Sequence, residues 1–291
     1  MESIHKTVLL QETVDGLNLT DGATVIDGTF GGGGHSLLVC QKFPKAKIIA
    51  IDQDAGAYER SKGKFKNLGC DIEFFNTNFR NIPEGKVDGV ILDLGLSSDQ
   101  LDNSGRGFSF MKSEPLLMTM KANPISEDVT AYDVVNTWSE ETLADIIYGY
   151  GEDKQARRIA KFIVDARKQK AIETTTDLVK VIEAAIPAKF RKSKIHFATK
   201  TFQAIRIAVN DELGALALGL EKGFDALRVG GRMSVISFHS LEDRVVKKFY
   251  KEKEKHGKGI LINKRVITAS EREIKNNSRS RSAKLRIIQK I

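Results

Sequence analysis

A run of four glycines, Gly31 to Gly34, constrains this chain more than any other feature of its sequence. It ends the segment "IDGTFGGGG" (26–34) and precedes residues 35–43, whose composition predicts a helix. Residues 23–28 and 46–52 are short apolar runs typical of buried strands. The glycines therefore form the turn after the first strand of a strand–helix–strand unit. Such a turn lies at the carboxyl edge of a parallel sheet, where a missing Cβ lets a ligand approach the backbone, although glycines also serve tight turns.

The order of the predicted elements indicates an α/β fold built from both ends of the chain. Apolar segments at 71–79 and 87–95 continue the strand series, and further strands are expected at 230–238 and 283–289. Residues 104–197 lack strand signals and show apolar residues at helical spacing, with Ser139 and Thr175 as predicted N-caps. One long helix is expected over 201–227. We therefore predict a sheet domain made of residues 1–103 and 198–291, with an inserted helical domain at 104–197.

Composition and cysteine spacing limit where the protein can act and which kinds of site it can have. The 291 residues are 41% hydrophobic, which is enough for one large domain or a domain with an insertion. We find no apolar run long enough to span a bilayer and no targeting segment, so we expect a cytoplasmic protein without a membrane partner. The two cysteines, Cys40 and Cys70, have neither metal-ligand nor CxxC spacing. They predict two buried, unreactive thiols, no disulfide framework and no metal.

The formal charge of +8 is unevenly distributed. Much of the excess lies in residues 187–200 and in the tail 245–290. A basic run is usually solvated surface, whereas several such runs in one chain of this size favour a polyanionic partner. Both interpretations stay open on charge alone.

The residues after the glycines bear on the class of cofactor. Asp52 ends the second predicted strand about 20 residues after the glycine turn, where a carboxylate reaches the ribose hydroxyls of a nucleotide-like cofactor. The dinucleotide pattern G-x-G-x-x-G fails, because Ser36 occupies its last position when counted from Gly31. A loop that opens with Asp27 is closer to the first motif of S-adenosylmethionine-dependent methyltransferases, although Thr29 stands where that motif commonly has a glycine.

Several longer segments carry a resemblance to a known family. In order from His5 to Arg286, the chain resembles the MraW/RsmH family in "HKTVLLQETVDGL", "IDGTFGGGGHS", "AIDQD", "ILDLGLSSDQLD", "RGFSF", "YGE…ARRIA", "TFQAIRIAVNDEL", "GGRMSVISFHSLEDRVVK" and "RSRSAKLR". The resemblance implies a class I methyltransferase fold, a Rossmann-like doubly wound sheet with an inserted helical domain. It also implies the cofactor S-adenosylmethionine, a location in the cytoplasm of a bacterium-like cell and, as substrate, the N4 amine of a decoding-centre cytosine in small-subunit (16S) ribosomal RNA.

The resemblance assigns cofactor contacts to particular residues. The glycine amides and the helix start can face the methionine carboxylate, since a helix N-terminus is an anion site. A carboxylate can accept from both ribose hydroxyls, and an aromatic ring can pack on the adenine, although one aromatic alone is usually core. The implied contacts are Gly33, Gly34, His35, Asp52 (ribose), Phe79 (adenine), Asp93 and Gln100.

Methyl transfer from a sulfonium is an in-line displacement, so catalysis depends mainly on positioning and control of charge. The cytosine amine is a poor nucleophile and needs acceptors that hold its N–H groups. Related amino-methyltransferases carry an Asp/Asn-Pro-Pro-aromatic motif that this chain lacks, and Asp93, Ser97 and Ser98 are the candidates in its place. His239 is a further candidate at the end of a neighbouring strand. The serines can instead form a turn or cap, and a lone histidine is more often structural.

Two groups of residues are candidates for RNA contacts. Phe108 and Phe110 can stack an unstacked base while Arg106 binds phosphate, or all three can pack at a domain junction. The basic runs supply the phosphate-contact candidates Lys189, Arg191, Lys192, Lys194, Arg279 and Arg281.

One stretch departs from the family pattern. After "RGFSF" the family would have approximately "DGPLDMRMD", and this chain has "SEPLLMTMK" (113–121). Three hypotheses follow from the sequence. The leading one, implied by the family resemblance, is a cytosine-N4 methyltransferase that is active as a monomer or homodimer on small-subunit ribosomal RNA or the assembled subunit. A second is a methyltransferase-like protein that binds RNA or ribosomes with an altered substrate or little turnover. A third is a nicotinamide-dependent oxidoreductase.

Overall fold

The computed structural model describes residues 6–97, 100–101, 103–121, 124–191 and 195–291. The chain divides into two compact units, one made of Met1–Ser97 and Leu213–Ile291 and the other of Ser98–Glu212. The first, hereafter the sheet unit, contains every named strand. The second, the helical unit, contains only one isolated bridge, Pro115 to Thr174, in the part of it that the structure describes.

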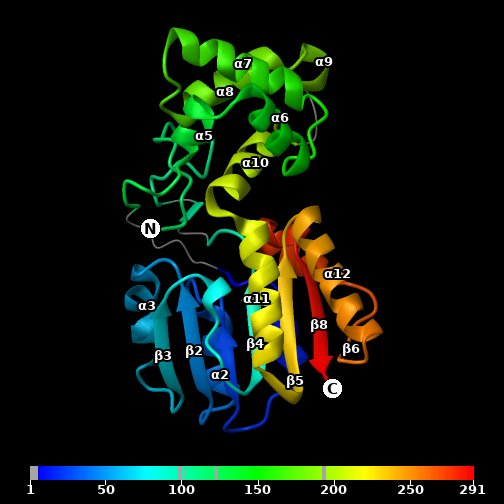
Figure 1. Cartoon of the computed structure of the whole chain (residues 1–291). Helices are drawn as coiled ribbons and strands as arrows, with labels where there is room; N and C mark the ends of the chain where they lie inside the picture. Colours follow the sequence, from blue (N-terminus) through cyan, green and yellow to red (C-terminus); the bar gives the residue numbers. More distant parts are fainter. Residues whose placement is uncertain (1–5, 98–99, 102, 122–123, 192–194) are drawn as a thin grey trace. The chain divides into compact units, whose positions relative to one another are not determined.

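The sheet unit is built on one sheet with the strand order β3-β2-β1-β4-β5-β8-β6 (Figure 1). Its strands are β1 (Thr24–Asp27), β2 (Lys47–Asp52), β3 (Asp71–Asn76), β4 (Val87–Asp93), β5 (Leu227–Ser237), β6 (Gly259–Leu261), β7 (Ile267–Thr268) and β8 (Lys284–Lys290). The strands from β3 to β5 pair in parallel, whereas β8 is antiparallel to β5 and pairs with β6 and β7. The predicted α/β class and its strands are confirmed.

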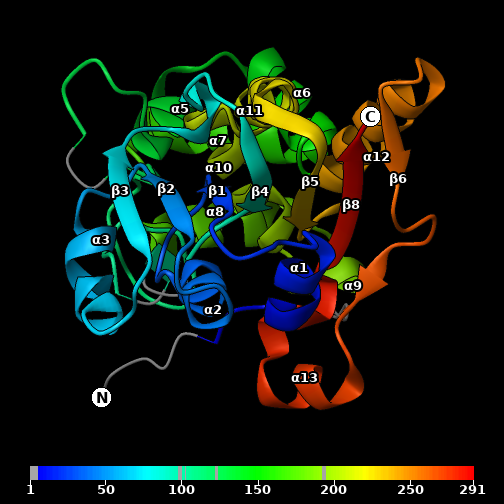
Figure 2. The same ribbon diagram turned by 90° about the horizontal axis from the view of Figure 1, so that it is seen from below.

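Helices cover both faces of this sheet (Figure 2). They are α1 (Leu10–Gly16), α2 (Gly34–Lys42), α3 (Gly56–Ser61), α11 (Glu212–Ala226) and α12 (Ser240–Lys255). The unit also contains α13 (Glu271–Asn276), which has no buried residue. On one face, Leu220 and Phe224 of α11 pack with Val90 and Leu92 of β4. On the other face, the side chain of Val39 from α2 packs with apolar residues of β1, β2 and β4. A sheet buried on both sides explains the near-continuous apolar runs of its strands.

The helical unit consists of α5 (Ala131–Thr137), α6 (Glu140–Gly149), α7 (Ala156–Gln169), α8 (Thr175–Ala185), α9 (Ala188–Arg191) and α10 (Thr199–Asn210). The hydroxyl of Ser139 accepts from the N–H of Thr142 and caps α6, as predicted. The predicted cap of α8 is wrong by one residue. Thr174 is the N-cap in a capping box with Asp177, and Thr175 is the buried first residue of the helix, whose hydroxyl donates to the carbonyl of Lys112.

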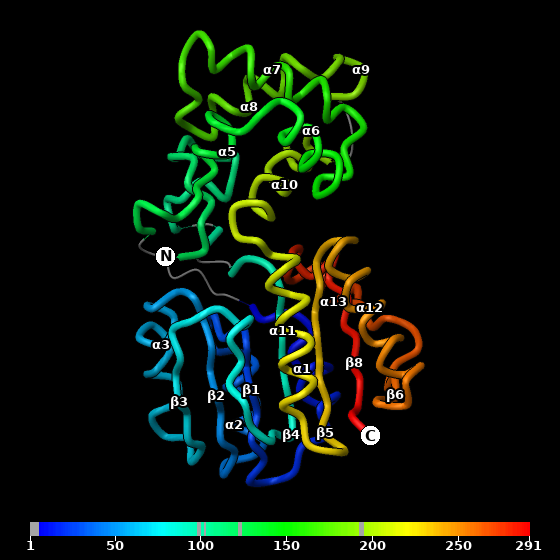
Figure 3. Tube along the Cα trace, in the orientation of Figure 1, coloured from blue at the N-terminus to red at the C-terminus, as the bar shows by residue number. Residues whose placement is uncertain are grey.

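The single helix expected over 201–227 is two helices, α10 and α11 (Figure 3). Asp211 between them has φ 45° and ψ 46°, a left-handed conformation that ends the first helix. Arg206 and Glu212 form a two-point ion pair across this break, with N–O distances of 2.7 and 2.9 Å. Because α10 contacts α5 and α6, it belongs to the helical unit, whereas the sequence placed residues from 198 onward in the sheet domain.

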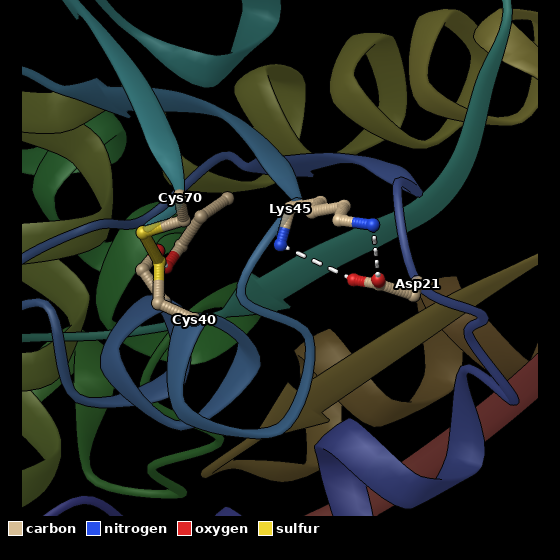
Figure 4. Close-up of a disulfide and its surroundings, with 6 residues drawn as sticks. Asp21, Cys40, Lys45 and Cys70 are labelled. Atoms are coloured by element: carbon tan, nitrogen blue, oxygen red, sulfur yellow. Dashed lines mark hydrogen bonds and ion pairs between the residues drawn. A yellow bond between two sulfur atoms is a disulfide. The ribbon is translucent and has the colours of Figure 1, made fainter. Parts of the chain in front are cut away.

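Cys40 and Cys70 are joined by a disulfide (Figure 4), so the expectation of two separate thiols is wrong. The strand–helix–strand fold brings the C-terminal half of α2 beside the residue before β3, and the two Cα atoms lie 5.4 Å apart, within bridging distance. Cys40 is buried and Cys70 is half-buried. Nearby, the backbone N–H of Lys45, in the turn between α2 and β2, donates to Asp21 and ties that turn to the segment before β1 (Figure 4). None of the helices in the described ranges is both long and apolar enough for a membrane span.

Candidate cofactor site

The glycine loop, residues 28–33, is fixed between the carboxyl ends of β2 and β4, the two strands that flank β1. The N–H of Gly28 donates to the carbonyl of Ile91 in β4 at 2.9 Å, and the N–H of Phe30 donates to the carbonyl of Ile51 in β2 at 3.0 Å. The N–H of Asp93 donates to the hydroxyl of Thr29 at 2.6 Å. The threonine that stands where the methyltransferase motif commonly has glycine therefore ties the loop to the end of β4.

Part of the need for glycine in this loop comes from the protein itself. Gly33 has φ 70°, and a Cβ on it would lie 2.8 Å from the ring of Phe30. A Cβ on Gly34 would lie 1.8 Å from Oγ1 of Thr7. The segment before α1 therefore lies against the start of α2. The glycine run alone could not predict this contact, because Thr7 and Gly34 are far apart in the sequence.

Asp52 at the end of β2 holds the loop from the other side. Its Oδ2 accepts the N–H of Gly31 at 2.6 Å, and its Oδ1 accepts the N–H of Asp54 at 2.8 Å. Burial raises the pKa of Asp52 to about 6, because desolvation of the carboxylate outweighs these two hydrogen bonds. The group is still mostly ionised at neutral pH and has lone pairs beyond the two in use.

A more deeply buried acid, Asp27, supports the helix start. Asp27 is almost fully buried, its Oδ2 accepts the hydroxyl of Ser36 at 2.6 Å, and its Oδ1 accepts the N–H of Thr29 at 3.3 Å. Desolvation raises the pKa of Asp27 above its usual range. The sequence indicated an acid at the opening of the loop, but its hydrogen bond to Ser36 depends on the fold.

His35 and Asp93 meet across the loop. Nε2 of His35 lies 3.4 Å from Oδ2 of Asp93, and the side chains are 4% and 19% exposed. Among the residues that the structure describes, Nδ1 of His35 and Oδ1 of Asp93 are buried without a hydrogen-bond partner. Buried polar atoms are rarely left unpaired, so each of these two atoms is suited to a hydrogen bond with a polar ligand.

Phe79 follows β3 and begins the short 3-10 helix η2 (Phe79–Asn81). Its ring packs against Gly219 of α11 so closely that a Cβ there would lie 2.4 Å from the ring. The side chain joins the core under α11 and is half-buried. The core interpretation therefore applies to one part of the ring, and the adenine contact stays a prediction for the rest.

The remaining catalytic candidates and the predicted cofactor contact Gln100 lie in different parts of the structure. Ser97 lies beside the loop, since a Cβ on Gly31 would be 3.9 Å from the Cβ of Ser97. Ser98 lies outside the described residues. Gln100 belongs to the helical unit, where its carbonyl accepts the hydroxyl of Ser104. His239 is the N-cap of α12, and its Nδ1 accepts the N–H of Glu242 at 3.4 Å, which favours the structural interpretation that the sequence left open.

The residues predicted to bind RNA separate into buried and exposed groups. Arg106 is buried and donates to the carbonyls of residues 119, 120 and 121, while its guanidinium lies 5.4 Å from the centroid of the buried Phe108 ring. This geometry favours packing for both residues over contact with phosphate or a base. Phe110 is half-buried, and Lys189, Arg279 and Arg281 are exposed. Arg191 is half-buried, and its Nε donates to the carbonyl of Ile186, whereas Lys192 and Lys194 lie outside the described residues.

A parallel sheet with this strand order, an antiparallel strand β8, a glycine loop after β1 and an acid at the end of β2 define a class I methyltransferase fold. The model of the MraW methylase family matches residues 2–291, and the chain belongs to that family. It is similar to proteins called ribosomal RNA small subunit methyltransferase H. The relative from Clostridium botulinum is 46% identical, that from Lactobacillus johnsonii 44% and that from Ruminiclostridium cellulolyticum 43%, each with both chains covered in full.

Proposed function

We propose that this protein transfers a methyl group from S-adenosylmethionine to the N4 amine of a decoding-centre cytosine in small-subunit (16S) ribosomal RNA. The observation that carries the proposal is the pair of acids, Asp52 and Asp93, at the ends of β2 and β4 on either side of the glycine loop. The names of the full-length relatives support ribosomal RNA as substrate. A ribosomal RNA substrate also fits the net charge of +8 and implies action in the cytoplasm.

The residues around the loop fit this cofactor. The nine-residue helix α2 begins at Gly34, so its first N–H groups suit the methionine carboxylate, beside Gly33 and His35. Asp52 would accept from the ribose hydroxyls with its remaining lone pairs, and Phe79 would pack on the adenine. Gln100 stays a proposed contact on the family resemblance alone. The cofactor supplies an electrophilic methyl group on a positively charged sulfur.

Asp93 is the residue that we propose to act on the amine. Its Oδ2 is 3.4 Å from Nε2 of His35, which orients the carboxylate, and its Oδ1 is the unpaired acceptor. An acceptor there would hold an N–H of the cytosine amine, direct the nitrogen lone pair toward the methyl group and draw on the proton as the amine acidifies. The hydroxyl of Ser97, also beside the loop, would hold the second N–H. Ser98 stays a candidate from sequence alone, and the helix-capping position of His239 argues for a positioning role.

The helical unit, which contains the inserted segment 104–197 predicted from the sequence, would recognise the RNA. The atypical stretch 113–121 bears on a second candidate function, binding of RNA or ribosomal particles with an altered substrate or little turnover. Within it, Glu114 accepts the N–H of Gly107, and three carbonyls accept from Arg106. These hydrogen bonds join the stretch to the segment that contains Arg106 and Gly107. The stretch lacks acids and an arginine that the family pattern has, and this difference could change the choice of substrate.

The test is methyl transfer from labelled S-adenosylmethionine to purified small subunits that lack the modification, followed by nucleoside mass spectrometry. The expected product is N4-methylcytidine, with large subunits as the negative control. A different methylated nucleoside would reject the N4 assignment. Binding of cofactor and RNA without any methylated product would favour the second candidate.

A further inference from the structure

Three rings of the helical unit stack against one another. The ring centroids of Phe110 and His196 lie 4.6 Å apart with their planes at 16°, and those of His196 and Phe197 lie 4.2 Å apart at 30°. Phe110 also meets the buried ring of Phe202 nearly edge-on at 5.3 Å. The stack therefore rests on a buried aromatic residue of α10, while His196 itself is exposed.

His196 is held in place by the start of α10. Its Nδ1 accepts the N–H of Ala198 at 3.3 Å, and its carbonyl oxygen accepts the N–H of Thr199 at 3.0 Å. With Nδ1 as acceptor, a neutral imidazole carries its proton on Nε2. Phe110 and Phe197 both stack on His196, so a planar partner would stack on this group of three rings, and a group whose orientation is already fixed loses little conformational freedom on binding.

The surrounding chain is basic and partly apolar. Residues 187–200 contain five Lys or Arg residues and no Asp or Glu. Phe190 is 48% exposed and Ile195 is 55% exposed, and Nζ of Lys189 lies 4.9 Å from the centroid of the Phe190 ring. Four chain steps join Arg191 to Ile195, so the end of α9 lies within about 15 Å of the residue that precedes the stack. Exposed rings among cations, with no acid in the segment, suit a polyanion that has planar groups.

We propose that Phe110, His196 and Phe197 form a platform on which unpaired bases of a single-stranded segment of the RNA substrate stack. This inference rests on the proposed function, because it takes the ligand to be ribosomal RNA. Every base has a planar face, so stacking on an aromatic ring contributes to binding for any sequence. Bases inside a duplex already stack on their neighbours, so the platform favours a single strand. The cations act on phosphates of both forms and supply no such preference.

Two substitutions separate stacking from the role of His196 at the start of α10. His196→Asn keeps a side-chain acceptor suited to a helix start and removes the ring. His196→Phe keeps a ring and removes the acceptor. His256→Asn is the matched control, because His256 is also exposed and lies at the end of α12 in the sheet unit.

The full-length protein and its variants are titrated into a fluorescein-labelled single strand of small-subunit ribosomal RNA sequence and into the duplex of that strand, and anisotropy gives the two affinities. We expect His196→Asn to weaken single-strand binding by about 5- to 100-fold, the range for losing one stacked base, with duplex affinity and melting temperature near those of the wild type. His196→Phe should bind the single strand like the wild type, and so should His256→Asn.

Wild-type single-strand affinity in a folded His196→Asn variant would overturn the platform. So would equal losses in the Asn and Phe variants, or an equal loss for the duplex. Methyl transfer by the wild type distinguishes the two proposals. A negative platform result with N4-methylcytidine formed rejects the platform alone, whereas ring-dependent RNA binding without methyl transfer rejects the activity and keeps the platform as an RNA site.

Discussion

Oδ2 of Asp52 accepts the backbone N–H of Gly31 at 2.6 Å, so the last residue of β2 holds the glycine loop that follows β1. The same carboxylate is the proposed acceptor for the ribose hydroxyls. It would therefore shape the loop and bind the cofactor with different lone pairs of one group. Changes at Asp52 should affect the cofactor through both routes.

Replacing Asp52 with Ala should weaken binding of S-adenosylmethionine by about 1.5–3 kcal/mol, the cost of losing hydrogen bonds to a charged group. The protein should stay folded, because the side chain is only partly buried at the edge of the sheet. Calorimetry gives the affinity, and circular dichroism checks the fold. Unchanged affinity in a folded variant would remove the ribose assignment.

The raised pKa of Asp52 predicts a pH dependence of cofactor binding. The free carboxyl titrates at about pH 6, and its protonated form loses acceptor strength, so affinity for S-adenosylmethionine should fall as the pH drops through 6. Calorimetry between about pH 5 and 8 measures this, and Asp52→Asn should remove the dependence. A wild-type affinity that is flat across this window would argue against a charged acceptor.

The same pKa shift has the opposite effect on stability. The folded carboxyl keeps its proton up to about pH 6, whereas the unfolded one releases it near 3.8. The free energy of unfolding that this shift contributes is therefore fully present below pH 3.8, and it is lost as the pH rises to about 6.

The contact between Gly34 and Thr7 predicts that Gly34→Ala strains the start of α2. The new Cβ would lie 1.8 Å from Oγ1 of Thr7, so the segment before α1 must move. We expect a loss of about 1–3 kcal/mol in unfolding free energy, typical of overpacking, together with weaker cofactor binding. Denaturant unfolding and calorimetry measure the two effects. Thr7→Ala in the same chain should recover part of both, and a lack of recovery would show that Thr7 is not the obstacle.

The sequence predicted local and periodic features well. The strands around Asp27 and Asp52 are recognisable because both faces of the sheet are covered, which makes each strand an apolar run. The helix break at Asp211 escaped prediction, because α10 and α11 both have good helix formers and the break depends on one left-handed residue. The direction of β8 also escaped, since an apolar strand reads the same in parallel and antiparallel pairing.

Contacts between distant residues could not be predicted. Thr7 against Gly34, the His35–Asp93 pair and the Cys40–Cys70 disulfide arise only when the fold is complete, and no spacing rule encodes them. For Asp93 the family resemblance named the residue, whereas the unpaired acceptor atom beside the loop became visible only in the structure.

The disulfide predicts that reduction destabilises the sheet unit. It closes a loop with a sequence separation of 30, which corresponds to about 3–4 kcal/mol in the chain-entropy estimate. Thermal unfolding with and without dithiothreitol measures the loss. Cys70→Ser should behave like the reduced protein and be insensitive to the reductant, and Cys70 is the better choice because it is half-buried whereas Cys40 is buried. Identical melting of oxidised and reduced wild type would show that the bridge adds no stability.

Asp93→Asn tests the proposed acceptor at the amine. The substitution keeps the size and one oxygen but removes the negative charge near the sulfonium and the pairing with His35. If Asp93 holds and deprotonates the amine, kcat should fall by about 10²- to 10⁴-fold, the range for general acid–base groups. If it only binds the cofactor, KM for S-adenosylmethionine should rise while kcat at saturation holds. Both constants are measured on small subunits, and a near-wild-type kcat would reject the catalytic role while the binding role remains.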